Sequence, residues 1–424
     1  VCHDATVSYA IDGQPLMVKE DYTFDTNKGY SNYRTHTYDA MGRLSTVKGE
    51  FQDSSADMVA LEYDAAGQVS RATYSKTAVD YGYTVAGLPR TMSGAGIAQT
   101  LYRADGTTPL YNGDISRITE TPLSATATAL DVTCSYDGAG RLTGLSGTEG
   151  STAKGTVSHG EEYVYDRNSN ITSLTRWGRT GPGDSYGIVD DLTMEYSGNR
   201  LLRVSDTAAE VLLEGSLDFT DGADHAGEYG YDACGNVIRD DNRGITRLEY
   251  NELGLPAVIE FDSGDRLEYA YDATGRKLSV ELVPAPDSDA PAALPMALPG
   301  ALTAGGALRS AVAERRDYYG AYELKNGSID RINTPWGYFR GGYHAYIRDR
   351  QGSVRAVLNA KSGDRAEQRA RYYPGGLPTH TPEGLDVNRY LHTSKELDTR
   401  LGLTLYDFEA RLYDPQLGRF LSPD

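Results

Sequence analysis

One short phrase recurs along the first two thirds of the chain: Tyr-Asp, two variable residues, a small residue that is usually Gly, then polar and apolar residues. Clear copies begin at Tyr38, Tyr63, Tyr136, Tyr165, Tyr231 and Tyr271, and weaker copies begin at Tyr83, Tyr196 and Tyr250. Most neighbouring copies lie roughly 20 to 35 residues apart, within the range of tandem-repeat proteins. A unit this short cannot bury its own apolar face, so neighbouring units must cover it.

The phrase predicts a β-hairpin. Tyr is favoured at the end of a half-buried strand, and the Asp carboxylate can accept a backbone N–H two residues further on. Gly three residues after Asp suits a turn position with positive φ, and alternation then restarts in the next strand. The predicted turn residues are Tyr38, Asp39, Gly42, Tyr63, Asp64, Gly67, Tyr136, Asp137, Gly140, Tyr165, Asp166, Tyr231, Asp232, Gly235, Tyr271, Asp272 and Gly275.

The aromatic composition supports a sheet with one dry and one wet side. The 424 residues include 32 Tyr, but only 7 Phe and 2 Trp. A Tyr ring can pack while its hydroxyl stays hydrogen-bonded, and stacked hairpins would align these rings into a cross-strand ladder. We therefore predict an all-β fold in which tandem hairpins form an extended, curved or spiral antiparallel sheet, as a partial or complete shell.

Residues 284–313 interrupt this pattern. They are rich in Pro, Ala, Leu and Gly and have no periodicity, which predicts a loop or flexible insertion. A short helix over 301–312 is a weaker alternative. The sequence is thus divided into a repeat sheet over 1–283, the insertion over 284–313, and a separate C-terminal domain over 314–424.

Composition and motif searches exclude several classes of function. The net charge of −19, without any Lys/Arg-rich run, argues against nucleic acid as a partner. No apolar run reaches the length of a membrane span. Cys2, Cys134 and Cys234 lack metal or disulfide spacing, and one Asp per repeat is too few for a calcium loop. We predict no metal and no cofactor.

No catalytic residue is predicted either. The seven His are scattered, and the chain has no HExxH, P-loop or G-x-S-x-G pattern. Adjacent carboxylates such as Glu161 and Glu162, or Asp190 and Asp191, would face opposite sides of a strand. Because the chain begins with Val1 and shows no signal peptide, we expect it to be a piece of a longer protein.

The C-terminal residues carry a specific motif. Lys395-Glu396-Leu397-Asp398 precedes a run from Gly402 to Phe420. The motif positions in this run are Gly402, Tyr406, Asp407, Ala410, Arg411, Tyr413, Asp414, Pro415, Gly418, Arg419 and Phe420. The run resembles the Rhs repeat-associated core domain in its Bacteroidetes form, and the Tyr-Asp phrases resemble the YD repeats that precede that core. The resemblance covers nearly the whole chain outside 284–313, although Ser394 stands where the family usually has Gly.

This resemblance implies a secreted or surface-displayed bacterial protein. In the family, the repeats spiral into a hollow wall that encloses or presents a polymorphic C-terminal effector or toxin, and the core closes one end. The partner would then be an effector domain of the same polypeptide. The family's aspartyl self-cleavage needs residues that would follow Asp424, so self-cleavage is not assigned to this chain.

A second interpretation is a cell-surface adhesion or carbohydrate-binding module. YD repeats also occur in large adhesion proteins, and Tyr-lined faces can stack on sugar rings. An enzyme with an unrecognised site is a third alternative, without a motif behind it. The sequence leaves open the cargo, the delivery system, the oligomeric state, shell closure and any self-cleavage of the parent protein.

Overall fold

The computed structural model describes residues 2–10, 13–23, 29–51, 54–105, 108–110, 112–122, 129–149, 157–182, 185–285, 313–382 and 384–423. Within these ranges the elements are β-strands and short 3-10 helices, and every assigned strand pair is antiparallel. The predicted all-β fold of hairpins in extended antiparallel sheets is confirmed. Most of the insertion, including the alternative helix over 301–312, lies outside the described residues. None of the described helices is long and apolar enough to cross a membrane.

The chain forms two compact units, each built from several segments. Unit 1 contains Val1–His159, Asn333–Arg371 and Pro382–Ser394, and unit 2 contains Gly160–Ile332, Tyr372–Thr381 and Lys395–Asp424. Each unit therefore combines strands from before and after the insertion. The division at 284–313 stays a prediction about sequence pattern, because these units are defined by spatial contacts.

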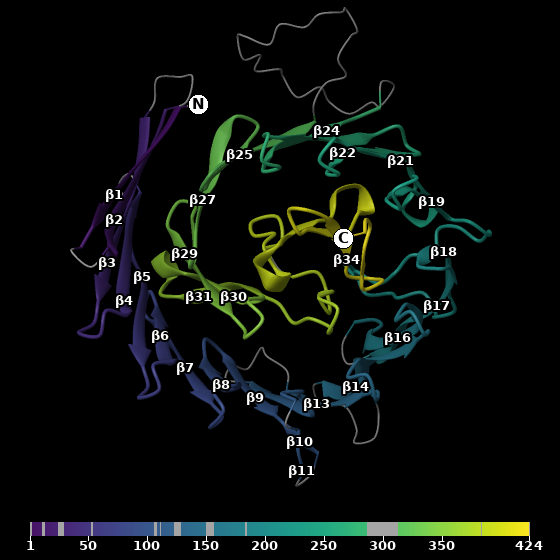
Figure 1. Cartoon of the computed structure of the whole chain (residues 1–424), viewed down its shortest axis with the longest axis horizontal. Coiled ribbons are helices and arrows are strands. Elements are labelled where there is room, and N and C mark those ends of the chain that lie inside the picture. The colour runs from purple at the N-terminus through teal and green to yellow at the C-terminus, as the bar shows by residue number, and fades with distance from the viewer. Residues whose placement is uncertain are drawn as a thin grey trace, which may run out of the picture. The chain divides into compact units, whose positions relative to one another are not determined.

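Unit 1 is a meander whose strands hydrogen-bond in chain order, as Figure 1 shows. These strands are β1 (Cys2–Tyr9), β2 (Pro15–Thr23), β3 (Gly29–Tyr38), β4 (Leu44–Phe51), β5 (Ser54–Tyr63), β6 (Val69–Tyr74), β7 (Thr77–Tyr83), β8 (Pro89–Gly94), β9 (Ile97–Tyr102), β12 (Arg117–Pro122), β13 (Leu130–Tyr136) and β14 (Leu142–Glu149). A short side hairpin pairs β10 (Ala104–Asp105) with β11 (Thr108–Pro109). A second group in this unit contains β28 (Gly337–Phe339), β29 (Tyr343–Arg348), β30 (Val354–Asn359) and β31 (Arg365–Arg369).

The second group of strands packs against the meander within unit 1. Strand β29 lies beside β5 and β6, and the ring of Phe339 meets that of Phe51 with centroids 6.5 Å apart. An added Cβ at Gly49 would lie 2.5 Å from Met58 Sδ and 3.2 Å from the Phe339 ring, so a larger residue would have to displace these side chains. A buried ion cluster closes the same interface, where Glu120 pairs with Arg355 at 2.8 Å and Arg371 at 3.1 Å.

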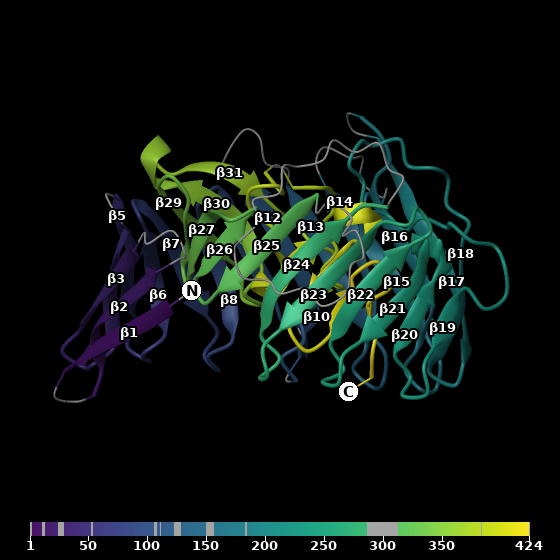
Figure 2. The same cartoon turned by 90° about the horizontal axis from the view of Figure 1, so that it is seen from above.

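Unit 2 is a second series of strands, which lie side by side in Figure 2. They are β15 (His159–Tyr165), β16 (Ile171–Arg179), β17 (Tyr186–Ser197), β18 (Arg200–Asp206), β19 (Tyr229–Tyr231), β20 (Val237–Asp240), β21 (Ile245–Tyr250), β22 (Pro256–Phe261), β23 (Arg266–Tyr271), β24 (Lys277–Val283), β25 (Glu314–Tyr319), β26 (Tyr322–Lys325) and β27 (Ser328–Thr334). A long irregular loop over 207–228 joins β18 to β19. The series β15–β27 forms the wall of unit 2.

The wall curves around the C-terminal segment Lys395–Pro423, drawn in yellow in Figure 1. That segment contains a small sheet of β32 (Glu396–Asp398), β33 (Leu405–Asp407), β34 (Leu412–Asp414) and β35 (Arg419–Phe420). Its strands are only two or three residues long, which is too short for an independently stable sheet. The segment must therefore draw its stability from the inner face of the wall.

Apolar side chains supply the first part of that stability. One buried cluster joins wall residues such as Leu248, Ile259 and Leu267 to Leu405 and Leu412 of the C-terminal segment. Alternation along each strand places these wall residues on one face. Burying a Leu side chain contributes roughly 1.5–3 kcal/mol, so the shared cluster holds the segment firmly.

Candidate functional site: the anchor of the C-terminal segment

The hairpin turn of the repeat is visible at Asp39. Its Oδ1 accepts hydrogen bonds from the backbone N–H groups of Met41 and Arg43, both at 2.9 Å. The N–H of Gly42 donates to the Asp39 carbonyl at 3.0 Å, and Gly42 has a φ of +75°, a conformation that strains residues with a Cβ. Tyr38 ends strand β3 at a register shift in the pairing. The Asp side chain thus supplies an acceptor for two backbone N–H groups of the turn.

The other copies of the phrase have the same arrangement. Each first residue ends a strand at a register shift: Tyr63, Tyr136, Tyr165, Tyr231 and Tyr271. Each following carboxylate accepts a backbone N–H four residues on: Asp64, Asp137, Asp166, Asp232 and Asp272. The glycines with positive φ are Gly67, Gly140, Gly235 and Gly275, whereas Ser169 takes this position, at +68°, in the copy that begins at Tyr165.

Successive hairpins are joined through the tyrosine hydroxyl groups. The hydroxyl of Tyr63 donates to the carbonyl of Leu44 at 2.7 Å, in the strand that leaves the preceding turn. The Tyr83 hydroxyl donates to the Val69 carbonyl at 2.9 Å in the same way. Tyr136, Tyr231 and Tyr250 repeat the bond with the carbonyls of Ile115, Leu201 and Val237. The phrase therefore encodes both the turn and its link to the unit before it.

The family-like motif near the C-terminus lies entirely within the anchored segment. The Tyr406 hydroxyl donates to the Gly376 carbonyl at 3.1 Å and that of Tyr413 to the Gly375 carbonyl at 2.8 Å. Pro415 follows β34, and Ala410 precedes it. The turn glycines Gly402 and Gly418 have φ values of +77° and +67°.

Aromatic and cationic side chains of the motif pack on each other. The Arg411 guanidinium lies over the ring of Phe420, 3.9 Å from its centroid. The Arg419 guanidinium lies 5.6 Å from the ring centroid of Tyr196 in the wall. Such cation–π contacts contribute roughly 0.5–1 kcal/mol each at exposed sites, so they support the anchor without dominating it.

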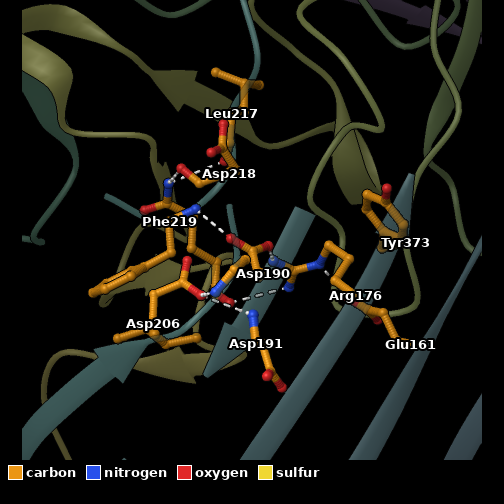
Figure 3. Close-up of polar contacts among 12 residues, drawn as sticks. Glu161, Arg176, Asp190, Asp191, Asp206, Leu217, Asp218, Phe219 and Tyr373 are labelled. Atoms are coloured by element: carbon orange, nitrogen blue, oxygen red, sulfur yellow. Dashed lines mark hydrogen bonds and ion pairs between the residues drawn. The ribbon is translucent and has the colours of Figure 1, made fainter. Parts of the chain in front are cut away.

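Arg176 of β16 is the first of three buried cations that hold the segment. Its side chain is 1% exposed and pairs with Glu161 at 2.6 Å and with Asp190, as Figure 3 shows. Its Nη2 donates to the carbonyl of Gln416 at 3.1 Å. The Phe219 N–H donates to the Asp190 carboxylate at 2.7 Å. Arg176 therefore ties the wall and the C-terminal segment together, and Asp190 adds the 207–228 loop.

The electrostatics of this cluster are unbalanced. One guanidinium serves two buried carboxylates, so the cluster carries an excess negative charge. Burial raises the pKa of Asp190 to about 6, although Arg176 opposes the rise. Burial by itself would lower the pKa of Arg176, but the charges of Glu161 and Asp190 raise it overall. The arginine stays charged, and Asp190 is the member that titrates near neutral pH.

Arg243 is the second buried cation. It follows β20 in a 3-10 turn and pairs with Asp240 and Asp414, both at 2.7 Å. Its remaining N–H groups donate to Gln416 Oε1 at 2.6 Å and to the carbonyl of Leu403 at 3.1 Å. Because Asp414, Gln416 and Leu403 all belong to the C-terminal segment, this one guanidinium holds the segment at three points.

Lys277 of β24 is the third buried cation. Its ammonium lies 2.6 Å from Asp407 Oδ2 and 2.9 Å from Glu396 Oε2. The Tyr318 hydroxyl donates to the Glu396 carboxylate at 3.0 Å. Burial would lower the pKa of Lys277, but the charge of Glu396, with Tyr318 and Asp407, holds it well above the ordinary value.

The anchor continues to the end of the described chain. The N–H of Val237 in β20 donates to the carbonyl of Leu421 at 2.9 Å, and the Leu421 N–H donates to the Leu412 carbonyl at 3.0 Å. Pro423 lies against the turn glycine Gly235, where an added Cβ would be 3.2 Å from the proline ring. The segment therefore ends at a defined place beside the β19–β20 turn.

The polar groups of this site are engaged with other groups of the same chain. Within the described ranges, no group of three His, Cys, Asp or Glu could hold a metal. The thiols of Cys134 and Cys234 are free, and burial raises the pKa of Cys134 to about 11. The buried carboxylates of the anchor are already occupied by cations of the chain itself.

The sequence motif includes only part of this site. Asp407 and Asp414 are motif positions, but no motif pointed to the ion pairs that they form or to the cations Arg176, Arg243 and Lys277. A signal exists at Arg176, since Leu174, Arg176 and Gly178 alternate on the inward face of β16. Glu161 is fully buried while its neighbour Glu162 is exposed. Such alternation shows which face a charge occupies, but it does not reveal the partner.

Comparisons with known proteins place the fold. No family model matches the chain. Salivary gland surface protein 1 of Aedes aegypti is 29% identical over 213 residues, which are 46% of this chain and 6% of that protein. Two crystal structures match 98% of the chain. They are TcdB2-TccC3 without its hypervariable C-terminal region, with a TM-score of 0.58 and 15% identity, and TcdB2-TccC3, with 0.56 and 16%.

The chain covers only 22% and 23% of those two solved chains. At such low identity the likeness shows a shared fold. It does not transfer the activity of those proteins to this chain. The shared fold spans both units and includes the C-terminal segment, since it covers nearly the entire chain.

Proposed function

We propose that this chain is a structural β-scaffold of the Rhs and YD-repeat type, in its Bacteroidetes form, that encloses or presents a C-terminal polymorphic toxin or effector. The observation that carries the proposal is the anchor: Arg176, Arg243 and Lys277 hold the C-terminal segment on the inner face of the wall of unit 2. A scaffold needs such a fixed segment, because it determines where the following chain leaves.

The repeat and the shared fold support the same proposal. Tyr-Asp turns linked by hydroxyl bonds build a long sheet with few open edges, which limits unwanted pairing with other chains. TcdB2-TccC3, which has this fold, carries a hypervariable C-terminal region. By analogy we propose that a variable effector or toxin is the cargo here, and that the protein is secreted or displayed on a bacterial surface. In this proposal the chain converts no external substrate.

A protection experiment tests the scaffold function. An unstructured peptide with one specific protease site is fused after Asp424 of the full chain, and the same peptide is fused before Val1 in a second protein. We expect cleavage after Asp424 to be at least about tenfold slower, since cleavage of a sequestered site follows the population of its open form. Equal cleavage rates at the two ends contradict enclosure. Arg243→Met should restore fast cleavage after Asp424.

A cell-surface adhesion or carbohydrate-binding module is the second candidate, favoured by the partial match to a salivary gland surface protein. Tyr102 of unit 1 is 39% exposed, with the Arg117 guanidinium 5.4 Å from its ring centroid, and exposed aromatic rings can stack on sugars. A glycan screen with the full chain tests this function. Saturable binding that is lost in Tyr102→Ala supports adhesion, whereas binding to no glycan counts against it.

A further inference from the structure

Lys277 differs chemically from the other two anchoring cations. An arginine guanidinium stays protonated in proteins and only pairs with carboxylates, whereas a lysine can lose its proton and become a nucleophile. The structure places this amine 2.6 Å from one carboxylate and 2.9 Å from another. The Lys277 side chain is 15% exposed, and those of Glu396 and Asp407 are 9% and 20% exposed. The three groups are thus largely withdrawn from water.

The two carboxylates have distinct environments. Glu396 and Asp407 face each other directly across the β32–β33 pair, where two like charges repel. The Tyr318 hydroxyl contacts both oxygens of Glu396, each at 3.0 Å, which holds that carboxylate in place. The Glu409 N–H donates to Asp407 Oδ1 at 2.7 Å, and Asp407 Oδ2 is the carboxylate oxygen closer to the amine. We therefore assign the Asp407 carboxyl carbon as the electrophile and Glu396 as the group that carries protons.

We propose that Lys277 and Asp407 condense to an intramolecular amide, with Glu396 as the proton carrier. Glu396 relays one proton from the Lys277 ammonium to the Asp407 carboxylate, so the proton stays within the cluster. The neutral amine then attacks the carboxyl carbon of the neutral Asp407 acid. A bond forms between Lys277 Nζ and Asp407 Cγ, one C–O bond of Asp407 breaks, and the oxygen leaves as water with the protons supplied through Glu396. The ammonium and carboxylate become one neutral amide and one water, so no oxidant or reductant is involved.

Two physical effects favour the product in this setting. A buried ion pair keeps a desolvation cost that a neutral amide does not have. Because the reacting groups are already in contact, the reaction also avoids the entropy loss of a bimolecular encounter. Tyr269, Leu403, Leu405 and Leu412 line the small enclosure around the cluster, and this lining limits the return of water to the amide.

The bond would join β24 of the wall covalently to β33 of the C-terminal segment, across 130 residues of sequence. The non-covalent anchor would become a permanent one. This inference goes beyond the proposed scaffold function, because it depends only on the three side chains and holds or fails whatever the cargo is.

Intact-mass measurement of the full chain, after denaturation, tests the condensation. The folded wild-type protein, incubated at neutral pH, should lose about 18 Da, the mass of the water released when the amine displaces hydroxide. Digestion should then give one cross-linked peptide that contains Lys277 and Asp407. A mass equal to the sum of the residues, with separate peptides at these positions, overturns the proposal.

Two variants separate the roles of the side chains. Lys277→Arg keeps the ion pairs but cannot condense, so it should show the full mass with little change in folding. Glu396→Gln keeps the shape of the site and should condense at least about a hundredfold more slowly, the lower end of the usual effect of losing a proton-transfer group. Condensation of Glu396→Gln at the wild-type rate removes Glu396 from the mechanism and overturns that assignment.

Discussion

At the scale of single residues, the tyrosine of the repeat does two tasks at once. Its ring packs at a strand end, and its hydroxyl reaches the carbonyl of the preceding hairpin, as Tyr83 does with Val69. A Phe would fill the same space and leave that carbonyl without its donor. This explains why the chain uses Tyr so heavily in place of Phe.

The hydroxyl link leads to a first prediction. Tyr83→Phe should lower the free energy of unfolding by about 0.5–1.5 kcal/mol, the usual net worth of one hydrogen bond. Tyr9→Phe serves as the matched control, because the side chain of Tyr9 is 62% exposed. Urea denaturation measures both changes. Equal midpoints for the two variants contradict the role given to the hydroxyl.

The turn glycine leads to a second prediction. Gly235 has a φ of +93°, and its missing side chain leaves room for Pro423. Gly235→Val should cost about 1–3 kcal/mol through backbone strain, with a further loss from displacing the proline. Asn236→Ala removes only a side-chain bond to Asp232 and should be milder. Thermal unfolding compares them, and identical melting temperatures are the contrary result.

At the scale of elements, the wall and the C-terminal segment depend on each other. The strands β32 to β35 are very short, and they hold their shape through cations supplied by β16, the turn after β20, and β24. Removing one partner from a buried ion pair leaves an uncompensated charge, which destabilises by roughly 3–5 kcal/mol. Exposed pairs contribute much less.

This contrast gives a third prediction. Arg243→Met should destabilise unit 2 by about 3–5 kcal/mol, because Asp240 and Asp414 lose a buried partner. Arg247→Met on the adjacent strand is the control. Its side chain is 54% exposed and pairs with Glu249 and Glu260 at the surface, so its loss should cost less than about 1 kcal/mol. Chemical denaturation of both variants distinguishes the two sites.

Asp190 gives a prediction about pH. Burial raises its folded pKa to about 6, above the unfolded value of about 3.9. The folded state therefore binds the proton more tightly, so this contribution to stability is full below about pH 4 and is lost as pH rises through 6. Asp190→Asn mimics the protonated form. Its free energy of unfolding, relative to that of the wild type, should therefore rise by up to about 3 kcal/mol between pH 4 and pH 8.

Urea midpoints at pH 5, 6, 7 and 8 for both proteins measure this difference. The Asn oxygen can still accept the Phe219 N–H, as Asp190 Oδ1 does, although the second carboxylate oxygen that pairs with Arg176 is lost. A difference between the two proteins that is constant over this range contradicts the assignment of Asp190 as the titrating member of the cluster.

The hairpins could be predicted from the sequence, whereas the ion pairs of the anchor could not. The hairpins were predictable because Tyr, Asp and Gly act within five residues, where local turn chemistry decides the structure. The cations were not, because Arg176, Arg243 and Lys277 lie 240, 171 and 130 residues from Gln416, Asp414 and Asp407. A charge at an inward strand position shows only that a partner exists.

At the scale of the whole molecule, both units show one mode of construction. Each combines a run of hairpins with segments from beyond the insertion, and each fixes that contact with a buried ion cluster. In unit 1 burial by itself would raise the pKa of Glu120, but the charges of Arg355 and Arg371 lower it to about 2. That cluster should therefore stay intact in mild acid while the one at Asp190 titrates.

Native-state hydrogen exchange of the full chain, read by mass spectrometry, tests the central claim most directly. If the C-terminal segment is an integral part of the scaffold, peptides covering Leu405–Asp407 and Leu412–Asp414 should exchange as slowly as those from β21 and β23, because both open only when unit 2 unfolds. Val237 should share this protection, since its N–H donates to Leu421. Exchange of the C-terminal peptides within seconds, while the wall stays protected, would contradict the account.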